Sequence, residues 1–100
     1  KPVMAELTGK QRRHLRGLGH HLKPAVIVGR EGLSATLLQT ADEYLRAHEL
    51  LKVKVLEACP LGTGEVAEEM AGALEAEKVQ RIGRTLLLYR PAEEPVIRLP

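Results

Sequence analysis

Strand-like runs alternate with stretches of helical periodicity along this chain, and this alternation constrains its fold more than any other feature. The strand-like runs cover residues 25–28, 51–55, 78–82 and 85–90, and helical spacing precedes or separates the first three. Strands that are separated by a helix tend to pair in parallel, whereas the tight reversal at Gly83-Arg84 predicts an antiparallel hairpin. The sequence therefore predicts an α/β (α+β) fold of order α-β-α-β-α-β-β, with helices packed on a four-stranded mixed sheet.

Capping residues and apolar stripes locate the helices. Thr8 with Gln11 has the pattern of a capping box, Ser34 is a cap for the second helix, and Thr63 for the third. The expected inward stripe of the first helix consists of Leu7, Gln11, Leu15, Leu18 and Leu22. We expect its basic residues to project to the other side: Lys10, Arg12, Arg13 and Arg16. The inward residues of the other two helices are Leu37, Leu38, Ala41, Leu45, Val66, Ala67, Met70 and Leu74.

Charge is distributed unevenly along the 100 residues, although the net charge is only +2. Residues 1–30 carry +6, residues 31–77 carry −7, and residues 78–100 carry +3. If the two ends of the chain fold onto one side, the protein has a basic face that suits a polyanion. The length predicts one domain over residues 1–100, with a core from about 7 to 99. A single cysteine and the lack of a membrane-length apolar run or secretory signal predict a cytoplasmic protein with no membrane partner.

The sequence contains no pattern that predicts catalysis. Cys59 lacks a recognisable activating partner, so we interpret it as a small buried hydrophobe. His20 and His21 are adjacent on a helix and point about 100° apart, which does not suit a metal site. The glycine loop lacks the Gly-Lys-Ser/Thr ending of a P-loop. We therefore expect no enzymatic activity, no cofactor, no metal and no small-molecule substrate.

A G-x-x-G loop between a strand and a helix is the strongest candidate for a binding site. Gly29, Arg30, Glu31 and Gly32 follow the apolar run of residues 25–28 and precede the helix that Ser34 caps. Glycines let backbone N–H groups approach a ligand, and the helix directs its positive dipole end to the same place. We expect this loop to bind backbone phosphates, with Arg30 at its tip.

The scarcity of aromatic residues restricts how such a site would contact nucleic acid. The chain has two tyrosines, Tyr44 and Tyr89, and neither phenylalanine nor tryptophan. Modules that stack single-stranded bases on a sheet need exposed aromatic side chains. The composition therefore favours contacts to phosphate and sugar over stacking.

Five segments in register give the chain a resemblance to a known family. They are Leu7-Thr8-Gly9-Lys10-Gln11, Leu22-Lys23-Pro24, Val28-Gly29-x-x-Gly32-Leu33, His48-Glu49-Leu50-x-Lys52-Val53-Lys54 and Gly83-x-x-Leu86-x-Leu88-Tyr89-Arg90. Together they resemble the CRM domain (chloroplast RNA splicing and ribosome maturation domain) in its stand-alone bacterial, YhbY-like form. The resemblance implies RNA binding, association with precursors of the large ribosomal subunit, and a fold similar to the C-terminal domain of translation initiation factor three.

The leading hypothesis is a non-enzymatic RNA-binding domain that assists assembly of the large ribosomal subunit, with ribosomal RNA and ribosomal particles as partners. Glu31 departs from the family, whose loop interior is basic or neutral. The alternative hypothesis is an adaptor that contacts ribosomal proteins through its acidic helices; charge alone does not distinguish RNA from DNA. The predicted RNA-binding residues are Gly29, Arg30, Glu31, Gly32, Lys23, Lys52, Lys54, Lys10, Arg12, Arg13, Arg16 and Arg84.

Overall fold

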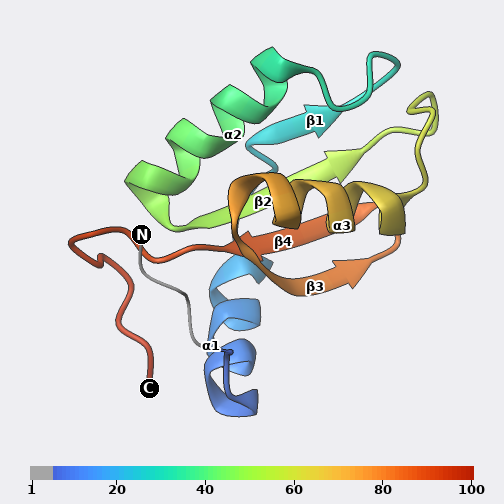
Figure 1. Ribbon diagram of the computed structural model, residues 1–100. Coiled ribbons are helices and arrows are strands. Elements are labelled where there is room, and N and C mark those ends of the chain that lie inside the picture. The colour runs from blue at the N-terminus through green and yellow to red at the C-terminus, as the bar shows by residue number, and fades with distance from the viewer. Residues whose placement is uncertain (1–5) are drawn as a thin grey trace.

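The computed structural model describes residues 6–100, and its elements follow the predicted order (Figure 1). The helices are α1 (Gly9–His20), α2 (Ala35–His48) and α3 (Thr63–Leu74). The strands are β1 (Val26–Val28), β2 (Leu50–Val55), β3 (Glu77–Ile82) and β4 (Thr85–Tyr89). Lys1, which contributes to the predicted basic N-terminal segment, lies outside the described range. Within residues 6–100, none of the helices has the length and apolar character needed to cross a membrane.

The four strands form one mixed sheet in the order β1-β2-β4-β3. β1 is parallel to β2, with Val26 opposite Val53, as predicted for two strands joined through a helix. β4 is antiparallel to both of its neighbours, so β3 runs in the same direction as β1 and β2. The last strand of the sequence therefore lies inside the sheet, and β1 and β3 form its two edges.

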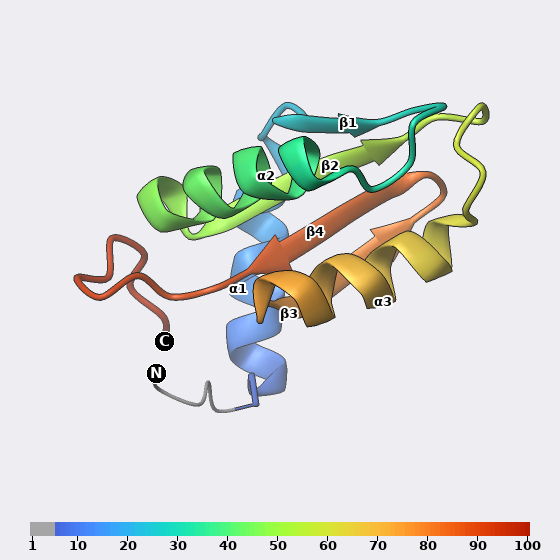
Figure 2. The same ribbon diagram turned by 45° about the horizontal axis from the view of Figure 1, so that its top comes forward.

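The two faces of the sheet are covered to different extents. α2 and α3 lie on one face and bury the larger part of the core, including Leu51, Val53 and Leu86 (Figure 2). α1 crosses the other face, where Leu15 packs against a smaller cluster that contains Leu87. Because side chains alternate along a strand, Lys52 and Lys54 of β2 lie on the α1 face, away from the valines.

α1 approaches the sheet through a glycine. A Cβ atom built on Gly19 would lie 2.5 Å from Cδ2 and 2.8 Å from Cδ1 of Leu87, so a larger residue here would require the Leu87 side chain to shift. Gly19 is buried, whereas Leu18 is 40% exposed. The prediction that Leu18 belongs to the inward stripe was therefore wrong, because the contact with β4 selects the neighbouring position. Leu15 is buried as predicted, and Thr8 and Gln11 form the predicted capping box.

One end of the sheet gathers three connections, and we call it the loop end. Since β1, β2 and β3 run in the same direction, the loop of residues 29–32, the connection of residues 56–62 and the turn at Gly83-Arg84 all lie there (Figure 1). α2 and α3 also begin at this end. Ser34 caps α2 as predicted, but the N-cap of α3 is Gly62 rather than Thr63. The backbone N–H of Gly62 donates to Oε1 of Glu65 at 3.0 Å, and glycine offers no side chain to accept from the first turn.

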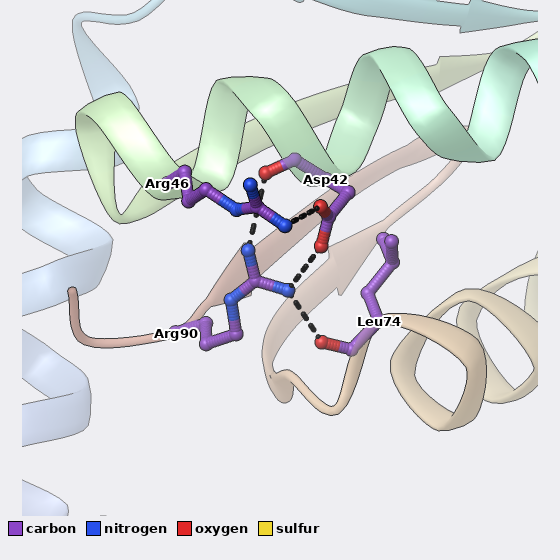
Figure 3. Close-up of polar contacts among 4 residues, drawn as sticks. All are labelled: Asp42, Arg46, Leu74 and Arg90. Atoms are coloured by element: carbon purple, nitrogen blue, oxygen red, sulfur yellow. Dashed lines mark hydrogen bonds and ion pairs between the residues drawn. The ribbon is translucent and has the colours of Figure 1, made fainter. Parts of the chain in front are cut away.

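At the opposite end, which we call the tail end, β4 finishes and residues 90–100 leave the sheet. Nη1 of Arg90 donates to Oδ1 of Asp42 at 2.7 Å and to the carbonyl oxygen of Leu74 at 2.8 Å (Figure 3). Asp42 also forms an ion pair with Arg46, one turn later in α2, at 3.0 Å. Arg90 thereby ties the middle of α2 to the end of α3, a role that the sequence did not indicate.

Glu49 organises the tail itself. It ends α2 with φ of 67° and is completely buried. Its carboxylate accepts hydrogen bonds from the backbone N–H groups of Ala92, Val96 and Ile97 at 2.6–2.8 Å. A buried carboxylate is stable only when such donors surround it. This one side chain therefore fixes the path of the C-terminal segment.

Candidate nucleic-acid interface

The G-x-x-G loop is an exposed turn between β1 and α2. The N–H of Gly32 donates to the carbonyl oxygen of Gly29 at 3.0 Å, which closes the turn. Arg30 and Glu31 at its tip are exposed. The left-handed conformation belongs to Gly32, with φ of 67°, and not to Gly29. At Gly32 a side chain would be strained, whereas a Cβ on Gly29 would only contact Leu56 at 3.5 Å.

The side chain of Ser34 caps the N-terminus of α2, which follows directly after the G-x-x-G loop. Oγ of Ser34 accepts a hydrogen bond from the N–H of Leu37 at 3.1 Å. Glu31, whose charge departs from the family pattern, makes no hydrogen bond or ion pair with any residue from 6 to 100. The Glu31 carboxylate is therefore not part of the cap at the positive end of α2.

The sheet presents an uncovered row of side chains beside the loop. Across the strands, Ile27 lies opposite Lys54, Lys54 opposite Thr85, and Thr85 opposite Ile82. α1 crosses the sheet nearer the tail end and does not cover this row (Figure 1). Ile27 is 57% and Ile82 65% exposed. The loop end of this face is therefore an exposed surface with a cation, Lys54, between two aliphatic side chains.

The two lysines of β2 have different surroundings. Nζ of Lys52 donates to the carbonyl oxygens of Gly19 and Leu22 at 3.1 and 3.0 Å, at the C-terminal end of α1. This contact adds a donor to carbonyls at the helix end and places a cation at the negative end of the dipole. Lys54 is exposed and has no hydrogen-bond or ion-pair partner within residues 6–100. Of the two, Lys54 has the charge that is available to a ligand.

Arg84 brings another cation to the loop end. It lies in the turn between β3 and β4, and its carbonyl oxygen accepts from the N–H of Val55 at 2.8 Å. Its Nη1 donates to the carbonyl oxygen of Leu56 at 3.3 Å, on the connection that follows β2. Arg84 is exposed. The loop end thus carries Arg30, Lys54 and Arg84.

The basic residues of α1 do not form the single surface that was predicted. Arg12 turns toward β3, where its Nη1 donates to the carbonyl oxygens of Lys78 and Val79 beside the β-bulge. Arg16 follows by one turn and shares that flank, whereas Lys10 and Arg13 are exposed and point away from the sheet. The expectation that Arg12 projects to the solvent side was wrong, because the bulge exposes carbonyls that need a donor.

The opposite flank of α1 faces the tail end. Nε2 of Gln11 donates to the carbonyl oxygen of Pro100 at 3.3 Å. Lys23 is exposed in the connection between α1 and β1, on the β1 edge.

The residues considered for catalysis or metal binding pack against other side chains of the fold. Cys59 is buried in the larger core, and the rings of His20 and His21 contact each other at 5.3 Å between centroids. Tyr89 is buried, and Tyr44 packs against the core and against His48. Within the part of the chain that the structure describes, no three His, Cys, Asp or Glu side chains gather as metal ligands.

The family model for the CRS1 / YhbY (CRM) domain matches residues 7–90, which span the loop and every element except the tail. The chain belongs to the CRM family. It is 41% identical to a Haemophilus influenzae protein named "RNA-binding protein", over 97% of this chain and 98% of that one. It is also 41% identical to "Probable RNA-binding protein YqeI" of Bacillus subtilis, over 88% of this chain and 92% of the relative.

The fold of this CRM domain matches a solved structure. The solution structure of the hypothetical protein SAV1595 from Staphylococcus aureus has a TM-score of 0.78 and 38% sequence identity, and the match covers 95% of this chain and all of the other. The three helices and the four-stranded mixed sheet are therefore an arrangement that this family adopts.

Proposed function

We propose that this CRM domain binds RNA through the loop end of its sheet, without catalysing a reaction. The observation that carries the proposal is the juxtaposition of the G-x-x-G loop with unpaired cations. Arg30 and Lys54 are exposed, have no partner among residues 6–100, and lie at the end where α2 and α3 begin. Cations without internal partners and two positive helix ends favour an anionic ligand. The names of the relatives favour RNA over DNA.

We also propose that the RNA is ribosomal RNA in precursors of the large subunit, and that the protein assists assembly in the cytoplasm. The proposal rests on the resemblance to the stand-alone bacterial members of the family. Crosslinking the protein to RNA in cells and sequencing the attached fragments tests the target directly. We expect reads that concentrate in large-subunit precursors. Copurification with ribosomal particles that survives nuclease treatment would instead favour the adaptor that contacts ribosomal proteins.

The electrostatic part of the proposal predicts how affinity depends on salt. If about four phosphates of single-stranded RNA are engaged, the logarithm of the association constant falls with the logarithm of salt concentration with a slope of about −3. Fluorescence anisotropy with a labelled RNA measures this slope. A slope near zero would contradict a phosphate-binding site.

Arg30→Ala tests the loop itself, with Arg98→Ala as the matched control. Arg98 is an exposed arginine of the tail, so both variants remove one exposed positive charge. We expect Arg30→Ala to weaken RNA binding about tenfold and to reduce the salt slope by about 0.7, because one phosphate contact is lost. Arg98→Ala should change the affinity by less than about twofold. Equal effects of the two variants would remove the loop from the binding site.

A further inference from the structure

A groove runs along the outer side of β1, beside the G-x-x-G loop. It has a volume of about 420 Å³ and is lined by residues of the strand, of the first turns of α2 and of the loop. We propose that this groove holds a single-stranded segment of the RNA, with a phosphate at the loop and bases or ribose against β1 and α2. This inference rests on the proposed function and specifies which form of RNA the site accepts.

The strand provides one wall of the groove. β1 is an edge strand whose neighbour, β2, lies on one side only. The outer side of such a strand presents backbone N–H and C=O groups that have no partner in the sheet. Single-stranded RNA exposes donors and acceptors on the edges of its bases, and these match a row of peptide groups. In a duplex, the same base edges are occupied by the complementary strand.

The helix provides the other wall, which combines an apolar side chain with hydroxyl groups. Leu37 is half-buried, and Thr36 and Thr40 are exposed beside it. Oγ1 of Thr40 donates to the carbonyl oxygen of Thr36 at 3.0 Å and keeps its lone pairs for an external donor. Apolar contact with neutral hydroxyls suits a base or a ribose. It requires no aromatic stacking, consistent with a chain that has only two tyrosines.

The charge at the end of the groove favours a nucleotide over an extended peptide. Among the residues that line the groove, the charged ones are Arg30 and Glu31, and both belong to the loop. The exposed Arg30 and the start of α2 place an anion site in line with the groove. A nucleotide has a phosphate to occupy that site while its base lies in the groove. A neutral peptide strand would leave the anion site unused.

The first experiment compares ligands on the unmodified protein. The probes are a labelled 12-nucleotide RNA of mixed sequence and the same strand annealed to its complement. We expect the single strand to bind at least ten times more tightly than the duplex. A duplex that binds as tightly as the single strand would overturn the inference, because a duplex cannot place its base edges against β1.

The second experiment narrows the groove without changing its charge. The double variant Thr36→Leu, Thr40→Leu replaces two exposed hydroxyl side chains, and Gln39→Leu is the control on an exposed α2 position outside the groove. We expect the double variant to weaken single-strand binding at least tenfold with an unchanged salt slope. Gln39→Leu should bind like the unmodified protein. Circular dichroism establishes that both variants are folded.

The outcomes separate the groove from the proposed function. If Arg30→Ala weakens binding while the double variant binds normally, the groove is not occupied by RNA but the RNA-binding function stands. If neither change matters and the salt slope is near zero, the proposed function fails together with the groove.

Discussion

The two ends of the sheet handle charge in opposite ways. At the tail end, Arg90 and Glu49 are surrounded by hydrogen-bond partners from α2, α3 and the C-terminal segment. At the loop end, Arg30 and Lys54 are exposed and have no partner among residues 6–100. Internal partners stabilise a buried charge, whereas an exposed cation without partners leaves its charge to the surroundings. The difference indicates that the tail end maintains the fold and that the loop end is available for binding.

The largest effect that we predict concerns Glu49. Glu49→Ala removes the acceptor of three backbone N–H groups in a buried site, so the free energy of unfolding should fall by about 3 kcal/mol. Urea denaturation followed by circular dichroism measures this change. Glu94→Ala, at an exposed position of the same segment, should stay within about 0.5 kcal/mol of the unmodified protein.

The RNA affinity of the Glu49 variant sharpens the comparison. Under conditions where the variant is fully folded, its affinity should be unchanged, because the substitution lies at the opposite end of the sheet from the loop. A variant that keeps its stability but loses RNA binding would break the division between the two ends.

A smaller effect distinguishes the two lysines of β2. Lys54→Met should weaken RNA binding about fivefold and leave the free energy of unfolding unchanged, because its ammonium group has no partner within residues 6–100. Lys52→Met should lower the free energy of unfolding by about 1 kcal/mol, because it removes the cation that caps α1.

Anisotropy and urea denaturation on both lysine variants provide the measurements. Each variant is the control for the other, since both remove one charge from the same face of one strand. If Lys52→Met weakened binding more than Lys54→Met at equal stability, the path of the RNA would run toward α1 instead of along the loop end.

The smallest effect appears only in alkaline solution. Burial, together with the nearby Glu49 carboxylate, raises the pKa of the Tyr89 hydroxyl above its usual value of 10.0. A raised folded-state pKa means that the contribution of Tyr89 to stability is complete below pH 10 and is lost as the pH rises through the folded-state pKa. Urea denaturation between pH 8 and pH 11 should show stability falling above about pH 10. The fall should be smaller in Tyr89→Phe; an identical fall would assign it to other groups.

Local sequence signals predicted the elements well, because they depend on neighbouring residues. The element order and the caps at Thr8 and Ser34 follow from spacing and are confirmed. The N-cap of α3 is Gly62 and not Thr63, and its backbone N–H is satisfied by the Glu65 side chain one turn later. Such an exchange within one turn is difficult to distinguish in a sequence.

Side-chain roles that depend on distant contacts could not be predicted in the same way. Arg12 and Lys52 are surface cations by periodicity, but each finds backbone carbonyls on another element. The structural roles of Glu49 and Arg90 were missed for the same reason, although both residues lie in the segments that resemble the CRM domain. The available signal for these roles was their position, since Glu49 directly precedes β2 and Arg90 directly follows β4.

The position of β4 has a consequence for how the newly made chain acquires its structure. Residues 85–89 are synthesised after every other strand, yet they fill the gap between β2 and β3. A ribosome that has produced only residues 1–82 has released two strands that lack their common neighbour. The domain therefore matures late in translation, and truncation before Thr85 would leave two exposed strand edges that invite self-association.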